Sequence, residues 1–191
     1  MKIGLYFGSF NPIHIGHLIL ANEALNQINL DQLWLMVSPQ NPLKKEATLL
    51  NANHRFHLVQ IAVEEDLRLR ANNFEFKLPK PSYTVHTLHY LTEKYPQHEF
   101  SILMGSDSLS NLPKWKNYEI ILKNYRLIVY PRNLFPLVEY PNARIEVLKD
   151  VPFLPISSSA IRKYIKAKKS IRYMVPEKVF LEIQNQGYYS N

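Results

Sequence analysis

Short apolar runs and longer amphipathic segments alternate along the whole chain. Runs typical of buried strands occupy residues 2–7, 32–37, 100–104, 127–130 and 145–148, and residues 67–77 have room for one or two short strands. Helical periodicity, or a helix-start signal, predicts helices over 18–28, 53–65, 82–93, 157–166 and 176–184. This alternation predicts an α/β fold, a Rossmann-like open and mostly parallel sheet with helices on both faces.

The segment 18–28 illustrates the helical pattern, because Leu18, Ala21, Leu25 and Ile28 fall on one helical face. Ser82 stands where a capping residue would begin the helix over 82–93. In open α/β sheets ligands bind beyond the carboxyl ends of the strands. We therefore expect the chemistry in the loops at 8–17, 38–45, 105–107 and 154–159.

Length and composition limit the classes of protein. The 191 residues suit a single domain, 1–191, and 46% of them are hydrophobic, which is enough for a substantial core. The sequence lacks cysteine, which excludes disulfides, a cysteine zinc site and a thiol nucleophile. It has neither a signal-peptide pattern at the N-terminus nor an apolar run of about 18 residues. We therefore expect a cytoplasmic protein with no membrane partner.

Several familiar motifs are missing. With only five glycines, the chain contains no glycine-rich dinucleotide fingerprint, no phosphate loop ending in Gly-Lys-Ser/Thr and no nucleophile elbow. A dinucleotide-dependent dehydrogenase is therefore disfavoured. Any bound nucleotide must have its phosphates held in another way.

The charge is strongly basic towards the C-terminus. The net charge is +7, and residues 151–191 carry seven Lys or Arg residues against two Glu, which leaves +5 in that segment. Such a bias suits nucleic acid, a membrane surface or a phosphorylated small molecule. A merely solvated basic helix explains the charge equally well.

The sequence GSFNPIHIGHL follows the first strand directly. Gly8 and Ser9 can form a turn whose amides face an anion, and Gly16 allows close approach of a ligand. His14 and His17, three residues apart at a helix start, share one face beside a helix N-terminus that favours negative charge. A bound polyphosphate would raise the pKa of both imidazoles. A metal site and a pair of structural histidines are the alternatives, and the surrounding glycines and serine favour phosphate.

A second anion-site pattern reads PISSSAIR, over residues 155–162. Hydroxyl residues before an apolar-periodic stretch are an N-cap signal, and free amides at such a cap bind anions. Arg162 lies one turn into the helix and offers a fork of donors for the same phosphates. Seen alone, the stretch is equally compatible with an ordinary serine-capped helix.

These two stretches resemble the motifs of the nucleotidyltransferase superfamily whose hallmark is His-x-Gly-His, shared more remotely with class I aminoacyl-tRNA synthetases. The second resembles its Ile-Ser-Ser-Ser/Thr-x-Ile-Arg motif, with Ser159 where Thr is frequent. Three further stretches, SPQNPLKK at 38–45, PSYTVHTL at 81–88 and GSDSLSNLPKW at 105–115, are similar to bacterial nicotinate mononucleotide adenylyltransferases. The C-terminal IRYMVPEKV is similar to that family's closing helix, so the resemblance spans essentially the whole chain.

The resemblance implies transfer of the adenylyl group of ATP to nicotinate mononucleotide, with Mg²⁺ carried mainly by the ATP phosphates and no protein metal site. It implies that residues 157–191 form a helical segment that completes the ATP site. Its catalytic residues would be His14, His17 and Arg162. Its ATP-binding residues would be Gly8, Ser9, Phe10, Gly105, Asp107, Ile156, Ser157 and Ser158. Its mononucleotide-binding residues would be Asn11, Lys44, Tyr83, Thr84 and Trp115, with Lys44 better aligned than Lys45.

Simple physical roles fit three of these residues. Trp115 or Tyr83 offers a flat apolar partner for a pyridine ring, and Asp107 at a strand end can accept hydrogen bonds from ribose hydroxyls. Core packing for the two aromatic residues and a helix cap for Asp107 are the alternatives.

Three other functions compete with this interpretation. The basic C-terminal region would suit nucleic-acid binding without catalysis, which leaves the order of the two motifs unexplained. A fragment of a tRNA-charging enzyme would need a Lys-Met-Ser-Lys-Ser loop, which is absent. An adenylyl- or cytidylyltransferase acting on another substrate, such as phosphopantetheine, is disfavoured by the resemblance alone. The preference for nicotinate over nicotinamide mononucleotide also rests on family likeness, and the sequence leaves the oligomeric state open.

Overall fold

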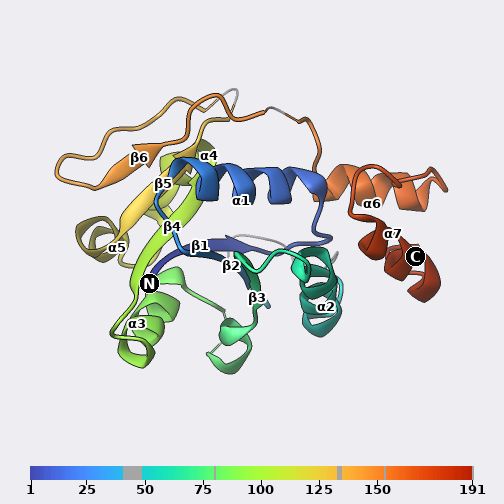
Figure 1. Ribbon diagram of the computed structural model, residues 1–191, viewed down its shortest axis with the longest axis horizontal. Helices are drawn as coiled ribbons and strands as arrows, with labels where there is room; N and C mark the ends of the chain where they lie inside the picture. The colour runs from blue at the N-terminus through green and yellow to red at the C-terminus, as the bar shows by residue number, and fades with distance from the viewer. Residues whose placement is uncertain (41–48, 80, 133–134, 153, 191) are drawn as a thin grey trace.

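A parallel β-sheet forms the centre of the molecule in the computed structural model, which describes residues 1–40, 49–79, 81–132, 135–152 and 154–190 (Figure 1). The six strands run in the order β3-β2-β1-β4-β5-β6, and every pairing between neighbours is parallel. They are β1 (Lys2–Gly8), β2 (Gln32–Val37), β3 (Leu69–Asn72), β4 (Glu99–Gly105), β5 (Arg126–Tyr130) and β6 (Ile145–Val147). Because β1 lies between β2 and β4, the order reverses there, and the switch point places a ligand site beyond the carboxyl end of β1.

Helices fill most of the connections. The α-helices are α1 (Ile15–Gln27), α2 (Ala52–Val63), α3 (Thr84–Lys94), α4 (Ser106–Ser110), α5 (Tyr118–Asn124), α6 (Ser158–Lys166) and α7 (Glu177–Gln186). Two short 3₁₀ helices, η2 (Phe74–Lys77) and η3 (Leu112–Lys114), lie in the connections that follow β3 and β4.

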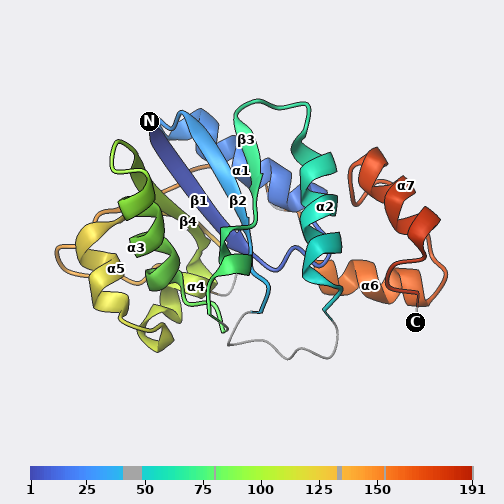
Figure 2. The same ribbon diagram turned by 90° about the horizontal axis from the view of Figure 1, so that it is seen from below.

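The alternation of side chains along the strands divides the apolar residues into two cores. Leu33, Leu35 and Tyr6 point to one face of the sheet, where α1, α2, α6 and α7 cover them. Ile3 and Leu5 point to the other face, which α3, α4 and α5 cover. Figures 1 and 2 show α1 and α3 on opposite sides of the strands. The predicted fold class, a parallel sheet with helices on both faces, is therefore confirmed.

The predicted elements differ from the structure in a few places. The region 67–77 contains one strand followed by η2, and α1 begins three residues before the predicted start. Ser82 does not cap α3, because the capping position is Tyr83 and no side chain bonds the helix start there. The short helices α4 and α5 were not predicted.

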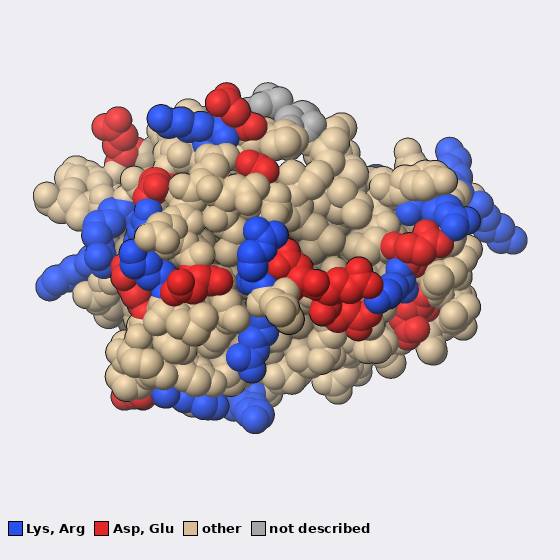
Figure 3. All heavy atoms as spheres, in the orientation of Figure 1, with Lys and Arg blue, Asp and Glu red and all other residues tan. Residues whose placement is uncertain are grey.

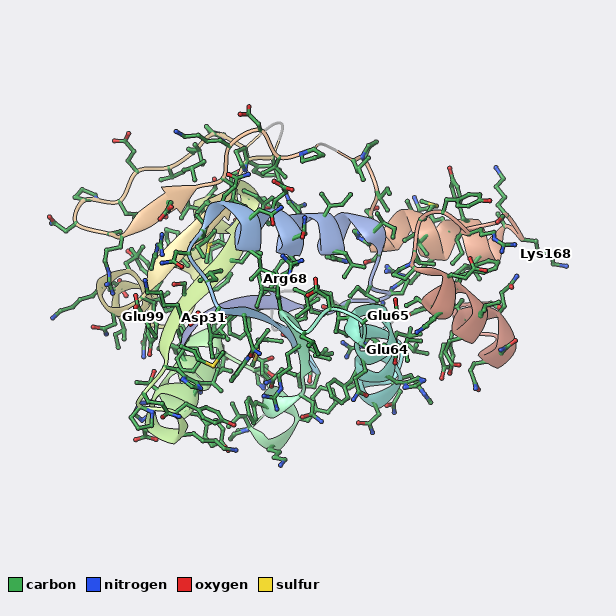
Figure 4. All side chains as sticks on the ribbon, in the orientation of Figure 1. Asp31, Glu64, Glu65, Arg68, Glu99 and Lys168 are labelled. Atoms are coloured by element: carbon green, nitrogen blue, oxygen red, sulfur yellow. The ribbon has the colours of Figure 1, made fainter. Side chains whose placement is uncertain are left out.

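The C-terminal helices lie at one end of the molecule, where α7 packs beside α2 (Figure 1). Lys178 of α7 donates to Glu64 and Glu65 just beyond α2, and both acids are labelled in Figure 4. The hydroxyl of Tyr188 lies 2.8 Å from Nδ1 of His54. These contacts hold the end of the chain against the sheet domain. No helix among the described residues is long and apolar enough to cross a membrane.

The basic residues of the C-terminal segment are mostly on its outer surface. Figure 3 shows Lys and Arg side chains at the α6 and α7 end interspersed with acidic ones. Lys168, at the end of α6, points away from the rest of the molecule (Figure 4). Most of the positive charge that the sequence places here is therefore solvated surface, and Arg162 is the exception considered below.

Candidate active site

A cavity of about 780 Å³ opens at the carboxyl ends of β1, β4 and β5. Its size is within the range of small-molecule and cofactor sites. Its described lining contains the cations Lys114, Lys116, Arg132 and Arg162 against the acids Glu75 and Asp107. The arrangement favours anionic ligands.

The two predicted anion motifs meet in this cavity. Nη1 of Arg162 in α6 donates to the carbonyl of Asn11 at 2.7 Å, and the Ser158 hydroxyl donates to the carbonyl of Pro12 at 2.8 Å. Ser157 caps α6 by accepting from the Ala160 amide at 3.2 Å. The serine-rich turn therefore lies directly beside the loop that follows β1, although about 150 residues separate them in sequence.

The two histidines stack at the start of α1, with ring centroids 3.7 Å apart. His14 is the capping residue, and its amide donates to Nδ1 of His17 at 3.2 Å. His17 lines the cavity, whereas His14 is buried and does not. The two rings therefore lie side by side, with His17 in the cavity lining and His14 more deeply buried. That both imidazoles serve one bound phosphate stays a prediction.

Burial controls the protonation of His14. Loss of solvent, with a smaller contribution from the positive charge of Arg132, lowers its pKa from 6.5 to about 4. The imidazole is therefore neutral at pH 7. Its Nδ1 is buried without a hydrogen-bond partner among the described atoms.

Two glycines make room for side chains of the site. A Cβ on Gly8 would lie 2.8 Å from the ring of Phe10, and a Cβ on Gly16 would lie 3.1 Å from Nδ1 of His14. The sequence suggested that Gly16 admits a ligand. In the structure it makes room for the imidazole of His14, which would have to shift slightly if residue 16 carried a Cβ.

Asp107 and Arg132 form the wall at the end of β4. Nε of Arg132 lies 3.3 Å from Oδ1 of Asp107 and Nη2 donates to the Tyr130 hydroxyl at 2.7 Å. The first contact is an ion pair without the alignment of a hydrogen bond. A Cβ on Gly105 would collide with the Asp107 carboxylate and would lie 2.9 Å from Arg132, so a larger residue there would displace these side chains. Asp107 does not cap α4, where the capping residue is Gly105.

Aromatic and hydroxyl side chains line the other part of the cavity. Tyr83, Thr84 and Trp115 all contribute, and Nζ of Lys116 lies 4.7 Å from the centre of the Tyr83 ring. Glu75 is buried there and accepts from the Thr87 hydroxyl at 2.9 Å. Burial raises the pKa of Glu75, which hydroxyl neighbours partly offset.

The structure therefore brings most of the candidate residues to one cavity. Those in its lining are Gly8, Ser9, Phe10, Asn11, His17, Tyr83, Thr84, Gly105, Asp107, Trp115, Ser158 and Arg162. His14, Ile156 and Ser157 are not in the lining. The hydroxyl of Ser157 caps α6 by accepting from the Ala160 amide, and it keeps its own O–H as a donor. Lys44 lies outside the described residues.

Sequence reasoning missed several residues that line or support the cavity. Arg132 is the clearest case, because it follows β5 with no motif around it, and only its place at a strand's carboxyl end could have pointed to it. Lys114 and Lys116, inside and just after the stretch 105–115, were passed over in favour of Trp115, and Glu75 lies in no motif. Arg55, buried beneath the loops, had no signal beyond its position in a predicted helix.

The parallel sheet has helices on both faces, and the sequence His-x-Gly-His follows β1. Helix α6, which Ser157 caps and which carries Arg162, lies against that loop. Together these features define a nucleotidyltransferase. The sequence profile of the cytidylyltransferase-like family matches residues 5–164. Curated relatives match the chain over nearly its whole length. A protein of Flavobacterium psychrophilum named "Probable nicotinate-nucleotide adenylyltransferase" is 49% identical over 99% of both chains. Another with that name, from Bacteroides thetaiotaomicron, is 44% identical over 94% of this chain and 89% of its own.

Solved structures share the fold. The Plasmodium falciparum nicotinic acid mononucleotide adenylyltransferase complexed with NaAD superposes with a TM-score of 0.82, at 20% identity, over 98% of this chain and 97% of its own. The same enzyme complexed with APC gives a TM-score of 0.81, also at 20% identity, over 98% and 96% of the two chains. At the identity of the curated relatives, the chain belongs to the nicotinate-nucleotide adenylyltransferase family within the cytidylyltransferase-like nucleotidyltransferases.

Proposed function

We propose that this protein transfers the adenylyl group of ATP to nicotinate mononucleotide, which gives nicotinate adenine dinucleotide and pyrophosphate. The observation that carries the proposal is the meeting of two anion-binding motifs in one cavity. The Asn11 carbonyl accepts from Arg162 and the Pro12 carbonyl accepts from Ser158, so the two ends of the chain form one cationic wall. The family of the chain and the size of the cavity support a reaction between two nucleotides.

The nucleophile needs little activation. The second pKa of a phosphate monoester is near 6, so the 5′-phosphate of the mononucleotide is already mostly ionised at neutral pH. Its oxygen attacks the α-phosphorus of ATP, the bond from that phosphorus to the bridging oxygen breaks, and pyrophosphate leaves with the electron pair. The main barrier is bringing two anions together in line, so positioning and charge neutralisation dominate.

We propose roles for the residues on the triphosphate side of the cavity. We assign His17 to the charge that develops at the α-phosphate, since its imidazole lines the cavity at the start of α1. We assign Arg162 and the first amides of α6, at Ser158 and Ser159, to the leaving pyrophosphate. Helix-start amides have no acceptor within the helix and bind anions well. His14 is neutral and acts behind His17 as its stacking partner.

The adenosine and the mononucleotide occupy the two walls. We assign Gly105 and Asp107 to the adenosine side. We assign Tyr83, Thr84 and Trp115 to the mononucleotide, with the flat rings against the pyridine. Lys116 beside Tyr83 supplies a positive charge that would favour a pyridine bearing a carboxylate.

Magnesium enters the proposed reaction as a companion of the substrate. The described residues include no group of three or more His, Asp or Glu side chains that could hold a metal ion. Asp107, in the cavity lining, pairs with Arg132. We propose that Mg²⁺ is held by ATP phosphates and water, where it neutralises charge on the triphosphate. We also propose that the protein works in the cytoplasm, where ATP is supplied.

The direct test is release of pyrophosphate from ATP with nicotinate mononucleotide, nicotinamide mononucleotide or phosphopantetheine as acceptor. We expect rapid release and dinucleotide formation with nicotinate mononucleotide, and slower release with the amide. Lys168→Ala, a change on the outer surface, is the matched control and should not alter the rate. Release with phosphopantetheine alone, or with no acceptor, would overturn the proposal.

A further inference from the structure

Arg55 lies beneath the site and binds four backbone carbonyls. Nη1 donates to the carbonyls of Ser9 and Ser38, at 2.6 and 2.8 Å. Nη2 donates to the carbonyl of Pro39 at 2.9 Å, and Nε donates to that of Leu50 at 2.8 Å. One planar guanidinium therefore joins three separate segments of the chain.

This side chain is a buried cation that pairs with no carboxylate of the described residues. Arg55 is 1% exposed, and none of the ion pairs among the described residues includes it. Burial lowers its pKa, although an arginine keeps its charge at neutral pH. A buried charge is unfavourable unless it is hydrogen-bonded, and four carbonyl oxygens fulfil that requirement here.

The three segments that Arg55 joins border the cavity. Ser9 follows β1, Ser38 follows β2, and both line the cavity. Leu50 leads into α2, and its amide donates to Oδ1 of Asn11 at 3.1 Å. Asn11 in turn accepts from Arg162 through its carbonyl. A continuous set of hydrogen bonds thus links Arg55 to the anion site.

Peptide geometry gives the contact with Ser9 a particular consequence. In a planar trans peptide the C=O and the following N–H point in opposite directions. When Arg55 binds the carbonyl of Ser9, the amide of Phe10 is therefore turned away from Arg55. Phe10 also has a φ of 43°, a left-handed conformation that a residue with a side chain rarely adopts. An external contact must hold this peptide in place, and Arg55 supplies one.

We propose that Arg55 is a positioning residue that fixes the loops after β1 and β2 in the arrangement that receives the phosphate of the mononucleotide. The inference rests on the proposed function, and it assigns Ser9 and Phe10, which the family resemblance gives to ATP, to the phosphate of the mononucleotide instead. Arg55 touches no substrate itself. The guanidinium orients the Ser9–Phe10 and Ser38–Pro39 peptides through its hydrogen bonds to the Ser9 and Ser38 carbonyls.

The test compares Arg55→Lys and Arg55→Ala with the unmodified chain and with Arg68→Ala. Arg68 is a half-exposed arginine that pairs with Asp66 at 2.8 Å, so its removal changes the net charge equally without touching the loops. Steady-state turnover gives kcat and the KM for each substrate. Calorimetric titration with nicotinate mononucleotide gives affinity, and circular dichroism with thermal unfolding shows that each variant is folded.

In Arg55→Lys, a single ammonium cannot reach four carbonyls on three segments. We expect kcat/KM for nicotinate mononucleotide to fall on the order of 100-fold, because small displacements of binding groups are costly, while the KM for ATP changes little. In Arg55→Ala, added guanidinium should restore part of the turnover, which a loss of overall stability would not allow. If Arg55→Ala does not fold, Arg55→Lys carries the test.

A folded Arg55→Lys protein with kcat and both KM values within about twofold of the unmodified chain would overturn the proposal. So would an equal loss for both substrates without rescue by guanidinium. The unmodified chain tests the proposed function separately. If it neither turns over nor binds nicotinate mononucleotide, the function itself is wrong, whereas a normal unmodified chain with an unchanged variant refutes the role of Arg55 alone.

Discussion

The buried imidazole of His14 should make the stability of the protein depend on pH. Its pKa is lowered from 6.5 to about 4, so between these pH values the imidazole is mostly neutral in the folded state and mostly protonated in the unfolded state. Stability is therefore fully present above about pH 6.5 and is lost as pH falls towards 4. The difference between the two pKa values lowers the free energy of unfolding at pH 4 by about 3 kcal/mol relative to neutral pH.

Urea unfolding of the unmodified chain and of His14→Asn, at several pH values between 4 and 7.5, measures this effect. We subtract the free energy of unfolding of His14→Asn from that of the unmodified chain. This difference should fall by about 3 kcal/mol as the pH is lowered from 7 to 4. Using a difference removes the opposite contribution of Glu75, whose raised pKa favours the folded state at low pH. His89→Asn is the control, because the side chain of His89 is 75% exposed. A His14→Asn profile parallel to that of the unmodified chain would refute the burial argument.

Three further substitutions probe the site. His17→Ala should lower kcat by roughly 100- to 1,000-fold, as loss of one donor to a developing charge does, and near-normal single-turnover rates would rule out its assigned role. Arg162→Lys should lower kcat/KM for ATP at least about tenfold, because a point charge cannot both bind the Asn11 carbonyl and fork to phosphate; an unchanged KM and kcat would contradict this. Gly105→Ala should displace Asp107, raise the KM for ATP and cost about 1–3 kcal/mol in urea unfolding, whereas an unperturbed variant would show that the wall is adaptable.

The centre of the sheet could be predicted because its strands are buried on both faces. A strand covered on both sides is apolar almost throughout, as in residues 33–37, and such runs stand out in a sequence. The short helices α4 and α5 gave no comparable signal. They span five and seven residues, too few for a periodic apolar face, and neither has a side-chain cap.

The candidate site could be predicted where loop chemistry is local. The loop over 8–17 and the serine cap of α6 carry glycines, hydroxyls and charges in short succession. Arg55 and Arg132 have no such context, because their importance comes from segments that only the fold brings together. The burial of His14 was equally hidden, since residues three apart share a helical face without having the same depth.

The central claim is that the two ends of the polypeptide form one triphosphate site. Amide and side-chain NMR signals, recorded while a non-hydrolysable ATP analogue is added, test it most directly. We expect His17, Ser158 and Arg162 to shift together along one binding curve, while residues on the outer surface of α7 do not respond. Shifts confined to one end of the chain, or two separate curves for residues 8–17 and 157–162, would contradict it.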